Sequence, residues 1–167
     1  MSESSLDLQN RDGFTPVDYA FVSNEQQILK CLQDKGTIAV TGKVGNHALF
    51  TAIRHGNLAA VDDMLFCGGD PNMKLAGDWS CLAISCSFGW PDIVQCFLCA
   101  GARHISPEGL SLFRIASSTM AVPETKKRLF INLVLGGVSP SHDDFTLLHE
   151  YLGGDFQTYV PVSYTHL

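Results

Sequence analysis

A unit of about 33 residues recurs along the chain, and this repetition constrains the fold more than any other feature of the sequence. The units end at glycines spaced 32, 33 and 36 residues apart, namely Gly36, Gly68, Gly101 and Gly137. Two apolar residues three positions apart precede each glycine, a spacing that places both on one helix face. The pairs are Leu29 and Leu32, Val61 and Met64, Val94 and Phe97, and Phe130 and Leu133. We therefore expect a repeat protein in which each unit buries its apolar face against the next.

Each unit also begins with a residue placed to cap a helix. In the first unit Thr15 precedes Pro16; a Thr hydroxyl can accept from the free amides of a helix start, and Pro suits the first helical position. The corresponding capping positions are His47, Ser80, Ser111 and Thr146. We expect a short first helix, a turn at Gly56, Gly89 or Gly154, and then a longer second helix. In the fourth unit extra residues at 118–122 precede Pro123, which is expected to begin the second helix.

This pattern resembles the ankyrin repeat, whose signature is Thr-Pro-Leu-His-x-Ala. The resemblance spans residues 10–160 and is carried by the period and by the opening Asp12-Gly13-Phe14-Thr15-Pro16-Val17-Asp18-Tyr19-Ala20. It implies an all-α fold, an α-solenoid of stacked helix-turn-helix repeats joined by hairpin-like loops, with four full repeats and a truncated fifth. The signature His occurs as His149, whereas other residues take its place elsewhere, so the repeats are divergent. Those residues are Asp18, Phe50, Ala83 and Arg114.

The two ends of the chain are expected to lie outside the repeats. Residues 1–9 are interpreted as a flexible N-terminal segment. Residues 162–167 read Val-Ser-Tyr-Thr-His-Leu, which resembles one reading frame of a transposon end attached to DNA when sequencing libraries are prepared. We therefore expect residues 161–167 to be a non-native tail and the chain to be a fragment of a longer protein. The alternative is a genuine tail.

Charge and hydropathy exclude several classes of partner. The net charge of −6 leaves no surplus of Lys and Arg for phosphate binding, which argues against a nucleic-acid partner. No uninterrupted apolar stretch reaches the roughly 18 residues that a membrane helix needs, and the first residues show no signal peptide. We interpret the cysteines as reduced core thiols of a cytoplasmic protein, because they lie in apolar, helical-looking segments. They are Cys31, Cys67, Cys81, Cys86, Cys96 and Cys99.

The sequence offers few candidates for chemistry. Cys96 and Cys99 have the spacing of a metal-binding or redox pair and His104 follows them, but zinc commonly needs two such pairs and the surrounding residues favour core packing. The segment 42–45 lacks the spacing of a phosphate-binding loop. His142-Asp143-Asp144 falls where a turn is expected, and turns favour Asp. We predict no enzyme activity, no cofactor and no metal.

The resemblance implies that another protein is held by the hairpin tips and by the exposed ends of the first helices, which form a concave face. The matching positions are Arg11, Asp12, Phe14, Lys43, Val44, Asn46, Arg54, His55, Gly77, Trp79, Ser87, Phe88, Glu108 and Leu110. Trp79 is either a binding hot spot or a residue packed against the neighbouring hairpin. Trp90 is expected at the opposite end, as a packing residue. A second hypothesis is that the repeats are the targeting arm of a longer protein, an enzyme or a ubiquitin-ligase adaptor, whose active domain follows.

Overall fold

The computed structural model describes residues 19–20, 27, 43–66, 69–74, 79–104 and 110–153, and the side chains from residue 48 onward in the first long range. The described part is all-α, as expected. Its helices are α3 (Lys43–Arg54), α4 (Leu58–Phe66), α5 (Cys81–Phe88), α6 (Pro91–Cys99), α7 (Leu112–Ser117), α8 (Pro123–Leu135) and α9 (Asp144–Leu152). No helix in these ranges is long and apolar enough to cross a membrane.

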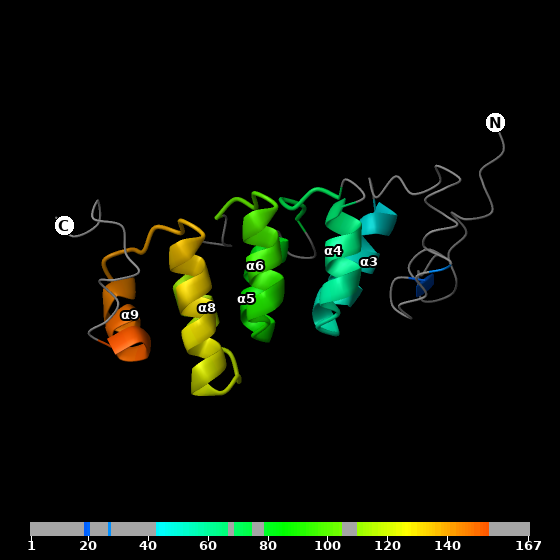
Figure 1. Ribbon diagram of the computed structural model, residues 1–167. Helices are drawn as coiled ribbons and strands as arrows, with labels where there is room; N and C mark the ends of the chain where they lie inside the picture. The colour runs from blue at the N-terminus through cyan, green and yellow to red at the C-terminus, as the bar shows by residue number, and fades with distance from the viewer. Residues whose placement is uncertain are drawn as a thin grey trace.

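In the part of the chain that the structure describes, the helices stand side by side in two rows (Figure 1). One row contains α3, α5, α7 and α9, each in contact with the next, and the other contains α4, α6 and α8. In the first row α3, α5 and α7 each also pack against the helix that follows in sequence, and α9 packs against α8. We call these the first row and the second row. The arrangement means that a helix pair buries its apolar side against the preceding and following pairs rather than in a separate core.

The helix ends repeat in atomic detail. At the end of α3 the Gly56 amide donates to the Ile53 carbonyl and the Asn57 amide donates to the Ala52 carbonyl; at the end of α5 Gly89 and Trp90 make the same two bonds, 33 residues later. Both glycines have positive φ, at 66° and 77°, a conformation that costs other residues free energy because of their Cβ. These glycines therefore end the first-row helices, as the sequence predicted.

The same motif ends two helices of the second row. The amides of Gly101 and Ala102 donate to Leu98 and Phe97, and those of Gly137 and Val138 donate to Val134 and Leu133. Gly101 and Gly137 again have positive φ, at 80° and 79°. The predicted glycine landmarks at these two positions are thus confirmed, and the interval of 36 residues between them includes the longer connection before α8.

Serine caps begin two of the first-row helices, as the sequence predicted. The Ser80 hydroxyl accepts from the Ala83 amide and the Ser111 hydroxyl accepts from the Arg114 amide, both at 3.1 Å. Pro123 begins α8. The predicted caps at His47 and Thr146 are wrong, because α3 begins before His47 and α9 begins before Thr146; the predicted cap at Thr15 lies outside the described residues.

The early start of α9 has a tertiary cause. Asp144 is almost fully buried, and its carboxylate accepts from the Ser141 amide and hydroxyl as well as from the Ser111 hydroxyl of the preceding helix pair. A buried carboxylate requires such donors, since it has lost its water. The helix, whose N-cap is Asp143, therefore begins where Asp144 can reach Ser111, three residues before the predicted cap at Thr146.

The core is one continuous apolar cluster between the rows, and its largest fully buried side chains include Phe97, Phe113 and Phe130. The Phe130 ring lies 5.5 Å from Phe113 of α7 and 4.9 Å from Tyr151 of α9, centroid to centroid, so it joins three helices. In the middle of the first row, every residue of α5 from Cys81 to Cys86 is buried. Such an all-round apolar helix must be covered on all sides.

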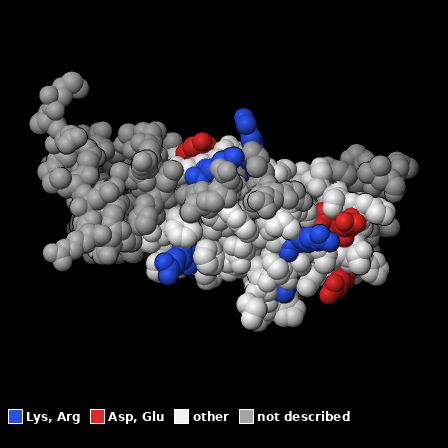
Figure 2. Space-filling model, turned by 180° about the vertical axis from the view of Figure 1, so that it is seen from behind, with Lys and Arg blue, Asp and Glu red and all other residues white. Residues whose placement is uncertain are grey.

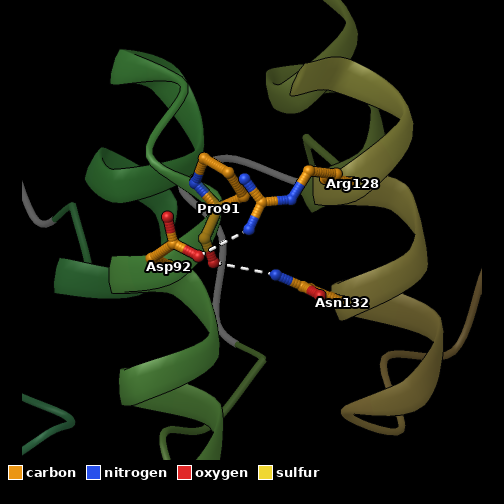
Figure 3. Close-up of polar contacts among 4 residues, drawn as sticks. All are labelled: Pro91, Asp92, Arg128 and Asn132. Carbon is orange, nitrogen blue, oxygen red and sulfur yellow. Dashed lines mark hydrogen bonds and ion pairs between the residues drawn. The ribbon is translucent and has the colours of Figure 1, made fainter. Parts of the chain in front are cut away.

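Polar contacts fix the lateral position of neighbouring pairs. Between α6 and α8, Arg128 donates to Asp92 at 2.6 Å and the Asn132 side-chain amide donates to the Pro91 carbonyl at 2.8 Å (Figure 3). The Arg128–Asp92 ion pair is exposed and contributes at most about 1 kcal/mol to the free energy of unfolding. The connection between α4 and α5 is fixed by an antiparallel bridge between Lys74 and Ser80.

Candidate functional site

Four of the predicted binding residues come together where α3 and α5 end. Arg54 and Phe88 are the last residues of these helices, His55 follows Arg54, and Ser87 precedes Phe88. Arg54 and His55 are exposed, and Phe88 keeps 43% of its surface exposed. Since α3 and α5 are in contact in the first row, the four side chains belong to one edge of that row. We call this edge, with the interhelix turns beside it, the turn edge.

The polar groups of the turn edge are partly used within their own helices. His55 donates from Nδ1 to the Thr51 carbonyl at 2.8 Å, which holds the imidazole against the last turn of α3. Ser87 donates to the Ile84 carbonyl at 2.8 Å. Arg54 and Phe88 are thus the two residues of this group whose side chains offer a long cationic group and an aromatic ring to a partner.

The turn edge includes large apolar residues that the sequence analysis did not select for binding. Met120 and Val122, in the connection before α8, are exposed, and Trp90 is exposed over about a third of its surface. They adjoin the turn: a Cβ placed on Gly89 would lie 3.0 Å from the Cβ of Ala121. The sequence could have indicated these exposed residues, because 118–122 are extra residues between two helices and such an insertion must lie at the surface.

Trp90 joins successive turns as a packing residue, as expected. A Cβ added to Gly56 would lie 2.9 Å from the Trp90 ring, so the indole covers the backbone of the preceding turn. Trp79, which follows the loop between α4 and α5, is half-buried and packs against the core. This packing is against the core, so the two interpretations offered for Trp79, a binding hot spot or packing against the neighbouring hairpin, stay predictions.

The remaining predicted binding residues do not lie at the turn edge. Leu110, just before the Ser111 cap, is exposed. Lys43, Val44 and Asn46 were expected on a hairpin, but their backbone lies in the first turns of α3, which corrects that placement. The helix extends upstream of His47 although Gly45 lies within it. The predicted residues outside the described ranges are Arg11, Asp12, Phe14, Gly77 and Glu108.

The face seen from behind in Figure 2 carries both signs of charge, in places side by side, within a largely uncharged surface. No single-sign field covers the described part of this face. A protein bound there would depend on apolar contacts and on individual hydrogen bonds or ion pairs, which give specificity at a few anchor residues.

The cysteines divide into two groups. Cys81 and Cys86 are buried core thiols, as expected, and burial raises the pKa of each to about 12. Cys96 is half-buried, and burial followed by the nearby Asp62 carboxylate raises its pKa to about 11. Cys99 is exposed, so its interpretation as a core thiol was wrong. Within the described ranges no three His, Cys, Asp or Glu residues are grouped to hold a metal ion.

Comparison with models of known protein families and with curated protein sequences finds no match for this chain.

Proposed function

We propose that this protein is a binding scaffold, an α-solenoid of divergent ankyrin-type repeats that holds a partner protein on its first row. The observation that carries the proposal is the repetition of the helix ends. The same pair of hydrogen bonds and the same positive-φ glycine recur at Gly56 and Gly89, and again at Gly101 and Gly137. With the two-row stacking, this supports the fold that the ankyrin resemblance implies.

The mechanism is rigid presentation. The turns at Gly56 and Gly89 fix where Arg54 and Phe88 lie, because Trp90 covers the first turn and the Ala121 methyl touches the second. Side chains held on a stacked framework lose little conformational entropy when a partner binds, so more of the contact free energy appears as affinity. Aromatic and Arg side chains are the residue types that most often dominate such interfaces.

The cysteines support an intracellular, reducing environment for this scaffold. All four cysteines in the described ranges are unpaired, and two of them are fully buried in the core. Unpaired thiols persist where glutathione and thioredoxin keep them reduced. A partner of this kind of scaffold would then be a cytoplasmic protein.

The proposal is tested with variants from the two rows. Phe88 and Leu135 are each the last residue of a helix and each is exposed, but they lie in different rows. Partners are captured from cells that express the protein, identified, purified, and measured by calorimetry. We expect Phe88→Ala and Arg54→Ala to weaken binding roughly 10- to 30-fold, which corresponds to about 1.4–2 kcal/mol.

Leu135→Ala serves as the control and is expected to leave the affinity of that partner within twofold. Circular dichroism at matched concentration verifies that all three variants keep their helix content. If both first-row variants bind with the affinity of the parent chain, the first row does not hold the partner and the assignment fails.

A further inference from the structure

The second row contains a groove that the proposed function does not use. It lies between α4 and α6, has a volume of about 590 Å³, and is lined by residues of these two helices and by Ala100, which follows α6. Its lining is Leu58, Asp62, Leu65, Phe66, Asp92, Gln95, Cys96, Cys99 and Ala100. We call it the second-row groove.

One wall of the groove has an ordered chemical pattern. Leu58, Asp62 and Phe66 are spaced four residues apart on α4, so they follow one another along a single helix face. Leu58 is 41% exposed and Phe66 is 90% exposed. The wall therefore presents apolar, acidic and apolar side chains in that order, over about 12 Å at 1.5 Å per helical residue.

The charge of the groove is negative and is not balanced within it. Its lining contains two carboxylates and neither Lys nor Arg. Asp92 is paired with Arg128, which reaches it from α8 on the other side (Figure 3). Within the described ranges, the Asp62 carboxylate accepts a weak bond from the Cys96 thiol, at 3.6 Å, and has no cationic partner.

The charge and the apolar side chains of the second-row groove favour some possible occupants over others. A second copy of the same groove would bring carboxylates against carboxylates, which disfavours a symmetric dimer through this surface. A purely apolar segment would cover Asp62 and leave its charge without a partner, at a cost in desolvation free energy. A segment with a cation between two apolar side chains satisfies all three positions of the wall.

We propose that the second-row groove binds an amphipathic helix of a partner protein that presents an apolar residue, a Lys or Arg, and a second apolar residue at successive four-residue spacings. The two apolar side chains pack against Leu58 and Phe66, and the cation pairs with Asp62. Helices that lay one face into a groove are recognised through anchors at such spacings. The groove is separate from the turn edge of the first row. The proposal for the groove and the proposed function can therefore each fail its own test independently.

The test uses two alanine-rich peptides of about 17 residues, long enough to hold a helix in water. One has Leu, Lys and Leu at four-residue spacings, and the other has Glu in place of Lys. Fluorescence anisotropy measures their affinities for the whole chain and its variants. We expect the Lys peptide to bind the parent chain at least about fivefold more tightly than the Glu peptide, and Asp62→Lys to reverse this preference.

Phe66→Ala is expected to weaken the Lys peptide at least fivefold, whereas Phe88→Ala, on the first row, should leave its affinity unchanged. The reversal by Asp62→Lys distinguishes a specific contact from adsorption of any cationic helix to a negatively charged protein. Equal affinity for the two peptides, an unaltered preference in Asp62→Lys, or no binding of the Lys peptide at millimolar concentration would each overturn the proposal.

Discussion

Replacing Phe130 with Ala tests whether neighbouring helix pairs share one core. The ring has no exposed surface, and it contacts Phe113 of α7 and Tyr151 of α9 in addition to its own helix neighbours. Truncation removes the transfer free energy of the ring and leaves a cavity, and Phe→Ala changes of this kind cost about 3–5 kcal/mol. That is a large part of the roughly 5–15 kcal/mol that stabilises a domain.

Urea denaturation followed by circular dichroism provides the measurement. With an m-value of about 2 kcal/mol/M for a chain of this size, a loss of about 4 kcal/mol lowers the transition midpoint by about 2 M. The matched control is Phe66→Ala, which removes the same atoms from a site that is 90% exposed and should change stability by no more than about 0.5 kcal/mol.

The two variants must therefore differ by more than 1 M in midpoint. If Phe130→Ala shifts the midpoint by less than about 0.5 M, or if both variants shift it equally, Phe130 does not join α7, α8 and α9 in a shared core. A lower m-value in Phe130→Ala would indicate that the pairs around α8 unfold separately, as nearest-neighbour coupling in repeat proteins allows.

Three further outcomes follow from individual groups. Ser111→Ala removes both the cap of α7 and a donor to the buried Asp144 and should cost at least about 2 kcal/mol in the same urea experiment; a loss of about 1 kcal/mol, the usual cost of a helix cap alone, would refute the role of Asp144. Burial raises the pKa of the Cys86 thiol from 9.0 to about 12, so the unfolded chain loses this proton first and stability should fall as the pH rises from about 9 towards 12. Cys86→Ala should show a shallower fall, and an unchanged slope would contradict the assignment. Iodoacetamide at pH 8 should alkylate Cys99 in the folded protein but Cys86 only after unfolding, as mass spectrometry of the digested chain will show.

The sequence predicted the parts of the fold that depend on local backbone requirements. Ser80 and Ser111 cap helices because a short hydroxyl side chain satisfies free amides whatever surrounds it. Gly89 and Gly101 end helices because positive φ is a property of the single residue. The start of α9 was predicted wrongly, since the Asp144 carboxylate accepts hydrogen bonds from Ser141 and also from the Ser111 hydroxyl 33 residues away, which local sequence does not indicate.

The exposed residues were predicted less completely than the buried ones, although helix spacing in the sequence could have indicated some of them. Val94 and Phe97 were correctly placed on the buried face of α6. Side chains two positions along a helix point away from that face, so Cys96 and Cys99 should have been placed outside the core. The same geometry exposes Phe66, two residues after the buried Met64. The groove could not be predicted in this way, because it forms only when α4 and α6 lie side by side in the folded structure.

The measurement that tests the central claim most directly is hydrogen exchange of the whole chain with and without a captured partner, read by mass spectrometry. A first-row scaffold predicts slower exchange on binding at the ends of α3 and α5, in the amides around Arg54 and Phe88, with smaller changes along α8. Protection confined to the second row, or none in either row, would contradict the claim that the first row holds the partner.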